Sequence, residues 1–147
     1  MERRKFIKTC CYTAIGVPLL VTTLQSCASA YFYAPVTLNK NRLVVKKADF
    51  WQVKKDKKIP RPFVLVKTPG MEFPICLYKI NEETYTASLL KCTHRGCELN
   101  VGGGIYSCPC HGSEFSIKGN VLEGPAEQNL KTFEIALDNE NIYILQS

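Results

Sequence analysis

The sequence predicts an all-β fold, an antiparallel β sandwich or barrel, preceded by an N-terminal signal or anchor helix. Beyond residue 40 the chain consists of short segments rich in β-branched and aromatic residues, which alternate with turn signals. No segment of useful length in that region has the period of a helix. Several strands at this spacing favour a sandwich or a barrel. We therefore expect a signal or anchor in residues 1–26, a linker in residues 27–41 and one β domain in residues 42–147.

The N-terminal 26 residues have the order of an export signal. Four basic residues lie within residues 3–8, and residues 9–39 carry no charge. A basic end of this kind stays in the cytoplasm while the chain after the apolar run is exported. Residues 3–8 resemble the twin-arginine signal, which exports proteins that have already folded. An ordinary basic region with two adjacent arginines is the alternative.

Two fates are open for the apolar run. Residues 24–27 resemble a bacterial lipoprotein cleavage box, in which Cys27 becomes the lipid-bearing first residue, although Gln25 is an imperfect fit to the small residue usual there. Alternatively the run remains as a membrane helix, but its strongly apolar part, residues 10–24, is shorter than the ~20 residues that span a bilayer. Either fate predicts a domain anchored to the membrane in the bacterial periplasm, at the outer face of the cytoplasmic membrane.

Short strands separated by breaks make up the first half of the predicted β domain. The breaks fall at residues 60–62, 68–70 and 81–83, where proline, glycine or asparagine occurs. A closing hairpin is expected from residues 130–137 and 141–145. The candidate strands before it are residues 42–46, 50–53, 63–67, 74–80 and 85–90.

Two features of this half have both a structural and a functional interpretation. Residues 54–58 contain four lysines and one aspartate, and we interpret them as a solvated hairpin tip that discourages edge pairing. Docking to an acidic partner or to anionic lipid headgroups is the alternative. Trp51 and Cys76 are expected in the core, Cys76 as a small apolar side chain without a partner.

The net charge of +6 does not indicate nucleic-acid binding. Residues 1–26 contain four basic residues and one acidic residue, so half of the excess belongs to the predicted signal. The remainder has 15 basic and 12 acidic residues, which is a mild excess. An apolar fraction of 46% is ordinary for a globular domain.

Residues 92–113 concentrate the chemistry of the chain. Half of its eight cysteines and both of its histidines fall there, in two arms. The first arm offers Cys92 and His94, and the second offers Cys108 and His111. Two thiolates and two imidazoles suit a tetrahedral zinc ion or an iron–sulfur cluster with mixed ligands. One cysteine is left over in each arm, although a zinc site requires only four ligands.

The two arms resemble the cluster-binding loops of the Rieske iron–sulfur proteins, in the disulfide-containing form found in cytochrome bc-type complexes. The resemblance includes Gly96 and Gly112 and is close over residues 85–137. It implies a Rieske-like fold with a cluster-binding part at about residues 91–126, one [2Fe–2S] cluster per chain and an oxidising compartment for a disulfide. The implied ligands are Cys92 and Cys108 for the inner iron and His94 and His111 for the outer iron, with Cys97 and Cys110 as the disulfide.

Further positions are expected to shape the surroundings of the cluster. Ser113 stands where the family has a hydroxyl donor to a bridging sulfide, and Phe115 stands where high-potential members have a tyrosine. The missing donor predicts an intermediate potential, suited to menaquinol or another moderately reducing donor. Arg95 replaces a usually apolar residue near the histidines, which favours reduction and an acidic partner. Gly124-Pro125 resembles the proline loop that covers the cluster in the family.

The resemblance implies an electron carrier: a membrane-anchored Rieske subunit that passes electrons from a quinol-linked complex to a cytochrome or another redox protein. The Rieske small subunit of an exported molybdenum oxidase, similar to arsenite oxidase, is a second candidate, since some of these subunits have phenylalanine at the tyrosine position. Soluble Rieske ferredoxins lack the extra cysteine pair. A zinc-binding interaction module without redox function is the alternative from another class. Outside the arms the sequence contains no nucleophile–base pair and no substrate-pocket motif. It therefore does not predict a self-contained enzyme.

Overall fold

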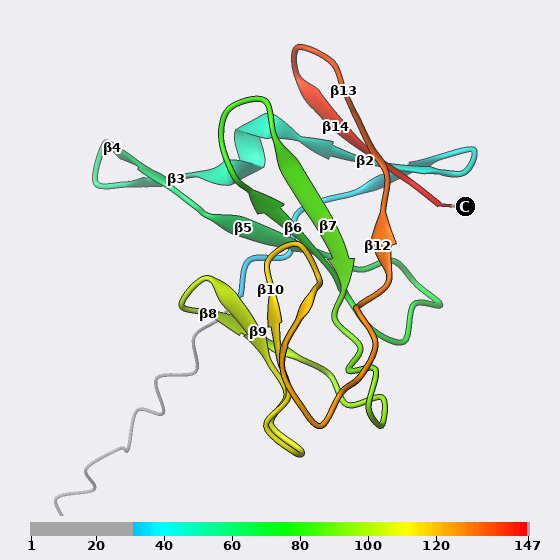
Figure 1. The fold of residues 1–147 in the computed structure, drawn as a ribbon. Coiled ribbons are helices and arrows are strands. Elements are labelled where there is room, and N and C mark those ends of the chain that lie inside the picture. The colour runs from blue at the N-terminus through cyan, green and yellow to red at the C-terminus, as the bar shows by residue number, and fades with distance from the viewer. Residues whose placement is uncertain (1–30, 147) are drawn as a thin grey trace, which may run out of the picture. The chain divides into compact units, whose positions relative to one another are not determined.

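The computed structural model describes residues 31–146, and this part of the chain is built almost entirely from β-strands (Figure 1). The prediction of an all-β fold is confirmed. A 3-10 helix, η1 (Lys47–Phe50), joins β2 to β3. The strands are β1 (Thr37–Asn39), β2 (Arg42–Lys46), β3 (Trp51–Lys54), β4 (Lys57–Pro60), β5 (Phe63–Val66), β6 (Ile75–Lys79), β7 (Tyr85–Leu89), β8 (Asn100–Gly102), β9 (Ile105–Ser107), β10 (Glu114–Ser116), β11 (Val121–Glu123), β12 (Thr132–Phe133), β13 (Ile135–Leu137) and β14 (Asn141–Leu145).

The predicted signal or anchor in residues 1–26 and the predicted lipidation site at Cys27 lie outside the described residues. Within residues 31–146, no helix has the length and apolarity that a membrane crossing requires. The anchor therefore stays a prediction from the sequence.

The folded domain begins before residue 42, in a stretch where the sequence predicts a linker. Tyr33 forms a parallel bridge with Leu65, and the N–H of Ala34 donates a hydrogen bond of 2.8 Å to the carbonyl of Leu65. Ala34 is buried, and β1 pairs antiparallel with β2. The sequence does not reveal this strand, because β1 has only three residues and all are exposed, which leaves no alternating apolar pattern.

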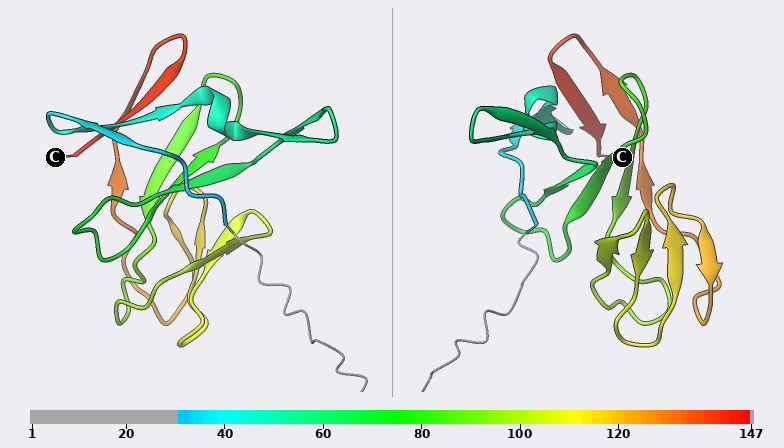
Figure 2. Two further views of the ribbon diagram at one scale, coloured as in Figure 1. Left: turned by 180° about the vertical axis from the view of Figure 1, so that it is seen from behind. Right: turned by 90° about the vertical axis from the view of Figure 1, so that its left-hand side faces the viewer.

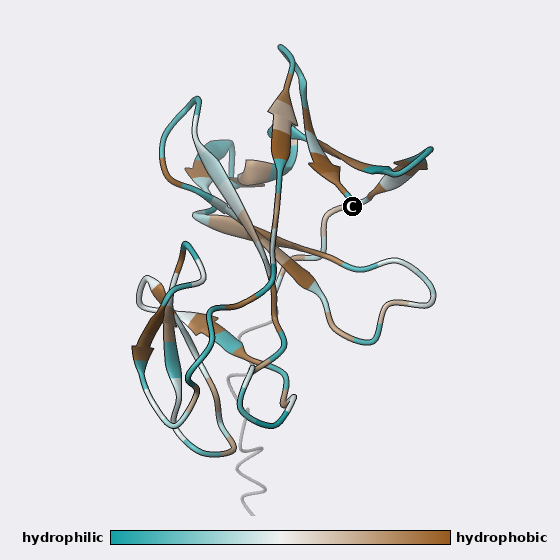
Figure 3. Ribbon diagram, turned by 45° about the vertical axis from the view of Figure 1, so that its right-hand side comes forward, coloured by the Kyte–Doolittle hydropathy of each residue, from teal (hydrophilic) through white to brown (hydrophobic). Residues whose placement is uncertain are grey.

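Three four-stranded sheets and one two-stranded ribbon make up the domain (Figure 2). The first sheet has the order β1-β2-β14-β13, the second β12-β7-β6-β5 and the third β11-β10-β9-β8, while β3 pairs with β4. The strand pairs of these sheets are antiparallel. Apolar residues concentrate on the strands, and the connecting loops are largely hydrophilic (Figure 3).

The second sheet contributes to two hydrophobic cores, one on each of its faces. Val64 and Val66 of β5 pack into the core shared with the first sheet, whereas Leu65 packs into the core shared with the third sheet. Successive side chains of a strand point to opposite faces, so β5 is buried on both sides. This burial explains why residues 63–66 form a continuous apolar run instead of an alternating one.

Cys76 is buried as predicted, whereas the prediction for Trp51 is wrong. Burial raises the pKa of the Cys76 thiol to about 12, so the group stays protonated and packs as a small apolar side chain. Trp51 remains 41% exposed. The reason is topological: β3 pairs with β4 alone, and both strands of this ribbon are exposed along their whole length.

The five predicted strands are present with small shifts at their ends, and residues 54–58 form the exposed hairpin tip that the sequence predicts. The sequence reasoning missed β4, because its lysines and proline hide a strand that has no buried face. It also missed the division of the closing segment into β12 and β13, which belong to different sheets. That division depends on which distant strands each piece pairs with.

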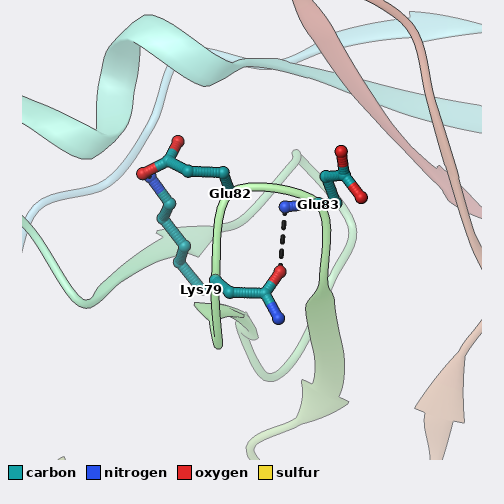
Figure 4. A network of polar contacts seen from close by, with 4 residues as sticks. Lys79, Glu82 and Glu83 are labelled. Atoms are coloured by element: carbon teal, nitrogen blue, oxygen red, sulfur yellow. Dashed lines mark hydrogen bonds and ion pairs between the residues drawn. The ribbon is translucent and has the colours of Figure 1, made fainter.

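The turn between β6 and β7 falls at the predicted break (Figure 4). The side-chain oxygen of Asn81 accepts a hydrogen bond of 2.9 Å from the backbone N–H of Glu83. The ammonium of Lys79 lies 2.7 Å from a carboxylate oxygen of Glu82 and 5.5 Å from the centre of the Trp51 ring. The turn therefore contacts the base of the β3–β4 ribbon.

The predicted cluster-binding part, at about residues 91–126, lies in an insertion between two neighbouring strands of the second sheet. The chain leaves this sheet at the end of β7 and returns in β12, which pairs with β7 through Thr132 and Ser88. The N–H of Leu89 donates a hydrogen bond of 2.8 Å to the carbonyl of Lys131, so the two ends of the insertion are joined. The third sheet and both arms lie between these two ends. Because the ends are joined, the insertion is attached to the second sheet at a single place.

The turn between β13 and β14 is organised by Asp138. Its carboxylate accepts hydrogen bonds from the hydroxyl of Tyr143 (2.5 Å) and from the backbone N–H groups of Asn141 (2.6 Å) and Glu140 (2.8 Å). These bonds, with that of Tyr143 foremost, lower the pKa of Asp138 well below its ordinary value of 3.8. The charged carboxylate is therefore the form that the fold favours.

We expect D138N to lower the midpoint of thermal unfolding at pH 7, because the amide is the weaker acceptor. The difference from the wild type should narrow as the pH falls below 4, since a carboxylate whose pKa is lowered by folding contributes stability only while it is charged. Circular dichroism at pH 7 and pH 3 measures both effects. E123Q, at an exposed glutamate of β11, removes one carboxylate charge in the same way and is the matched control. A D138N difference that does not change with pH would contradict this account.

Candidate metal centre

The two arms fold into loops with the same backbone hydrogen bonds. In the first arm, the N–H of Gly96 donates to the carbonyl of Cys92 (2.8 Å), and the N–H of Cys92 donates to the carbonyl of Cys97 (2.8 Å). In the second arm, Gly112 donates to Cys108 (3.0 Å), and Cys108 donates to the carbonyl of Ser113 (2.8 Å). Each loop is thus closed on its own first residue, a cysteine.

The glycine of each arm allows this closure. Gly96 and Gly112 both have a φ of 77°, in the left-handed region where residues with a Cβ are strained. Both stand four positions after the cysteine that begins the arm, whereas the histidines His94 and His111 stand two and three positions after it. The two loops therefore share their backbone geometry because the glycine has the same position in each. The histidines occupy different positions in these otherwise equivalent loops.

A disulfide between Cys97 and Cys110 joins the two arms, as the family resemblance implied. The cysteines are 13 residues apart in sequence, and closing a loop of that size contributes about 3 kcal/mol in the chain-entropy model. The sulfur atoms of Cys97, Cys108 and Cys110 lie within 4.8 Å of one another. These three are not a ligand set, because the two sulfurs of the disulfide have no thiolate to offer a metal. Their closeness shows instead that the disulfide packs against Cys108.

The four predicted ligands form an inner and an outer pair. Cys92 and Cys108 are free thiols with exposed fractions of only 2% and 4%. His94 is half-buried and His111 is exposed, and the centres of their rings are 5.0 Å apart with an interplanar angle of 81°. The arms therefore bury their sulfur atoms and present their imidazoles side by side at the surface.

One atom of this group requires a partner beyond the described protein atoms. Nδ1 of His94 is buried and makes no hydrogen bond within residues 31–146. Buried polar atoms in native proteins are almost always satisfied, so an unpaired imidazole nitrogen beside two buried free thiols indicates a metal-binding position. The donor set, two thiols and two imidazoles, is the set that a Rieske cluster takes. The residues present therefore fit a [2Fe–2S] cluster.

The loop with Gly124 and Pro125 is tied to both arms. The hydroxyl oxygen of Ser113, which is fully buried, accepts a hydrogen bond of 3.0 Å from the N–H of Ala126. On the other side, the Thr93 hydroxyl donates a bond of 2.6 Å to the carbonyl of Gln128. The peptide bond before Pro125 is cis, and this proline lines a cavity of about 500 Å³ together with His94.

The sequence reasoning singled out Ser113 but missed Thr93 and Gln128. The Ser113 hydroxyl accepts a hydrogen bond from the backbone of the loop with Gly124 and Pro125, and its O–H remains available to donate. The Thr93–Gln128 contact joins residues 35 positions apart in sequence through a backbone carbonyl, so residue type alone provides no signal for it. A hydroxyl between the cysteine and histidine of the first arm is the only hint in the sequence.

Phe115 and Arg95 occupy two different environments. Phe115 of β10 is fully buried and lies opposite Tyr106 of β9, so a hydroxyl is absent from the ring at this position of the third sheet. Arg95 is exposed and lines a groove of about 550 Å³ beside His94. Lys91, Lys131 and Glu72 line the same groove, and the Lys91 ammonium lies 3.9 Å from a carboxylate oxygen of Glu72, so the groove has three cations and one anion.

Residues 43–134 match the family model of the Rieske [2Fe-2S] domain, which is more than half of the 147 residues. The chain therefore belongs to the Rieske [2Fe-2S] family. Membership defines an electron-transfer protein whose cofactor is a [2Fe–2S] cluster, so the zinc-binding alternative is not retained.

Relatives with this domain cover part of the chain. The cytochrome b6-f complex iron-sulfur subunit of Synechococcus sp. (strain JA-2-3B'a(2-13)) is 42% identical over 53 residues, 35% of this chain and 31% of the relative. The corresponding subunit of Prochlorococcus marinus (strain MIT 9303) is 40% identical over 57 residues, 37% of this chain and 32% of the relative. The match thus spans about a third of the length of these curated relatives.

Two solved structures extend the comparison. The cyanobacterial plasma membrane Rieske protein PetC3 from Synechocystis PCC 6803 is 34% identical, with a TM-score of 0.50 over 56% of this chain and 85% of that protein. A chain from the complex of reduced oxygenase and oxidised ferredoxin in carbazole 1,9a-dioxygenase is 23% identical, with a TM-score of 0.55 over 74% of this chain and 95% of that one. The second likeness shows a shared fold.

We expect S113A to destabilise the holoprotein by about 1–3 kcal/mol, because the Ala126 N–H, beside a fully buried serine, would lose its acceptor. Denaturant unfolding followed by the visible absorption of the cluster measures the effect. S116A is the matched control, since the Ser116 hydroxyl accepts a 3.1 Å bond from the exposed N–H of Asn120. Water can replace that acceptor, so the control should lose less. Equal losses in the two variants would contradict a specific role for Ser113.

Proposed function

We propose that this chain is the Rieske subunit of a membrane-bound quinol:cytochrome oxidoreductase-type complex, in which it takes electrons from a quinol and passes them to a cytochrome. The observation that carries the proposal is the pair of imidazoles, His94 and His111, at the surface of two arms joined by a disulfide. Because the two imidazole rings lie at the surface, a quinol and then a redox partner can bind to them in turn. The b6-f subunits among the relatives support the choice of complex.

In this proposal the buried thiol pair and the surface imidazole pair each hold one iron of the cluster. Cys92 and Cys108 bind the inner iron, where their burial excludes water, and His94 and His111 bind the outer iron. When bound, the cluster accepts and returns one electron. Two neutral imidazoles in place of two thiolates reduce the negative charge of the site and make reduction easier. The disulfide holds the arms together while the charge of the site changes.

The histidines also handle the proton of the quinol. We assign the buried, unpaired Nδ1 of His94 to the metal, which leaves Nε2 of this ring for a hydrogen bond with the quinol hydroxyl. The exposed ring of His111 has the same role in the second arm. Holding a quinol hydroxyl at such a nitrogen lets the proton leave as the electron leaves.

Further residues support the histidine pair, some near the proposed cluster and some in the N-terminal segment. Ser113, whose hydroxyl oxygen accepts from Ala126, would have its O–H free to donate to the cluster, and Gly124 and Pro125 would form a rigid wall that excludes water. Residues 1–26 act as an export signal or a membrane anchor, with Cys27 as the lipid-bearing residue if the signal is cleaved. The domain is then held in the bacterial periplasm, at the outer face of the cytoplasmic membrane.

A second candidate is the Rieske small subunit of an exported molybdenum oxidase, similar to arsenite oxidase. The buried Phe115 favours it, because this residue removes a hydroxyl that high-potential quinol-oxidising relatives have near the cluster. The two candidates differ in the molecule that reduces the cluster, which is quinol in one case and the molybdenum subunit in the other.

Reduction of the cluster in native membranes distinguishes the two. Membranes that contain the full chain are mixed with a short-chain menaquinol, and the cluster is followed by electron paramagnetic resonance while a haem is followed by absorbance. We expect the reduced-cluster signal and the reduced-haem band to appear together. H111A, which removes one outer ligand, should show neither signal. Reduction by arsenite but not by menaquinol would overturn the leading proposal and support the second candidate.

We expect F115Y to raise the midpoint potential by roughly 60–130 mV, because one charge-assisted hydrogen bond to a ligand thiolate contributes about 1.5–3 kcal/mol. Voltammetry of the holoprotein measures the change. F115L is the control, since it alters the same buried position without adding a donor. An unchanged or lowered potential in F115Y would contradict the role assigned to this position.

A further inference from the structure

The β3–β4 ribbon is a separate feature that neither the cluster nor the sheets around it explain. Its strands, Trp51–Lys54 and Lys57–Pro60, pair with each other alone in the described part of the chain. All of their residues are exposed, and the ribbon extends from one side of the domain (Figure 1). An isolated two-stranded hairpin is only marginally stable in water, so a ribbon kept in this form requires a reason.

The ribbon combines exposed apolar residues with a high positive charge. Trp51, Val53 and Ile59 are exposed to 41%, 69% and 43%, which places three of the large exposed apolar side chains of residues 31–146 in one short hairpin. The segment between them, residues 54–58, has four lysines and one aspartate, a net charge of +3. A solvated tip explains the lysines, but it does not explain an exposed tryptophan.

The register places the largest apolar groups on one face. Trp51 and Val53 are two residues apart in β3 and therefore share a face, and their cross-strand partners are Pro60 and Lys58. This face thus has a tryptophan, a valine and a proline at its base and middle, with a lysine beside the valine. Ile59 lies on the opposite face, across from Gln52.

The base of the ribbon is held in place, so the exposure of this face is built into the fold. Nη1 of Arg61 donates hydrogen bonds to the carbonyls of Asp49 (3.0 Å) and Trp51 (2.6 Å), and its guanidinium lies 3.9 Å from the centre of the Phe32 ring. The Lys79 ammonium lies 5.5 Å from the Trp51 ring. These contacts fix the direction in which the ribbon leaves the domain.

The tip retains charged residues in a conformation that favours others. Lys55 and Asp56 have φ values of 48° and 60°, the left-handed pair of a two-residue hairpin turn. Asparagine and glycine are the usual residues of such a turn, and a lysine at its first position is strained. The tip thus has a lysine although its left-handed backbone conformation favours asparagine or glycine.

We propose that the β3–β4 ribbon docks on an anionic lipid surface. Lysines near a membrane interact with phosphate-bearing headgroups, and tryptophan has its preferred location at the interface between headgroups and acyl chains. Trp51 and Val53, which share one face of the ribbon, enter the interface, and the lysines of residues 54–58 contact the headgroups. The inference does not rest on the proposed quinol-linked function.

The ribbon and the arms are in different parts of the domain. The ribbon leaves beside η1, whereas the loops at residues 92–97 and 108–113 lie at the far end of the third sheet in both Figure 1 and Figure 2. Docking of the ribbon therefore leaves His94 and His111 free for a redox partner, and it restricts the orientations of the domain on the membrane.

Trp51 is the only tryptophan of the chain, so its fluorescence reports on the ribbon without a label. The full-length holoprotein is mixed with vesicles of phosphatidylcholine alone, or of phosphatidylcholine with phosphatidylglycerol. We expect the Trp51 emission maximum to move to shorter wavelength with the anionic vesicles and to stay unchanged with the neutral ones. Residues 1–26 also carry basic residues that favour anionic vesicles, so the contribution of the ribbon is isolated by variants that share this N-terminal segment.

Variants test the two components of the proposal. K57Q/K58Q should lower partition to the anionic vesicles by roughly tenfold or more, since two lysine–headgroup interactions are lost. V53S should reduce the spectral shift with the charge unchanged. K46Q/K118Q, which removes two exposed lysines elsewhere, is the matched control and should behave as the wild type. The cluster absorption and circular dichroism of each variant verify that it is folded.

Three results would overturn the proposal. One is an unchanged Trp51 emission of the wild type with anionic vesicles. Another is an equal loss of partition in K57Q/K58Q and in K46Q/K118Q, which would reduce the effect to overall charge. The third is a shift with soluble polyglutamate but not with vesicles, which would identify an acidic protein surface as the partner of the ribbon.

Discussion

The closure of each arm on its first cysteine is the constraint on which the site depends. Cys92 and Cys108 each engage both of their backbone groups in hydrogen bonds within their own loop, and a left-handed glycine completes each closure. The cysteine side chains are thereby directed into the core between the second and third sheets, while the histidines remain at the surface. The division into a buried thiol pair and an accessible imidazole pair follows from this backbone pattern, and electron transfer at a protein surface needs that division.

The rest of the domain holds these two loops at one place. The insertion leaves and re-enters the second sheet at adjacent positions in β7 and β12, so the third sheet cannot move far from its support. The Cys97–Cys110 disulfide joins the arms, and the covering loop is bonded to each arm through Ser113 and Thr93. Three independent connections therefore restrain the positions of the predicted ligands.

Two surfaces link this centre to its surroundings. The groove beside His94 has Lys91, Arg95 and Lys131 on its walls against one carboxylate, Glu72, and this net positive charge favours a partner with acidic groups. The β3–β4 ribbon, well away from the arms, has the lysines and the exposed Trp51 on which the proposed lipid contact is based. A domain that contacts lipid through one surface and a redox partner through the other can transfer electrons while it stays at the membrane.

The sequence by itself determined the chemistry and the local structure of this protein. The spacing of cysteines and histidines in the two arms, the five strands before the first arm and the breaks between them are short-range features that were predicted from neighbouring residues, whereas β10 and β11 were not predicted. Only the tertiary structure decided that residues 31–41 belong to the domain, that Trp51 is exposed and that Thr93 holds Gln128. These outcomes depend on pairings between segments far apart in the chain. Such pairings use backbone hydrogen bonds and leave some strand faces uncovered, and neither feature can be recognised from residue types.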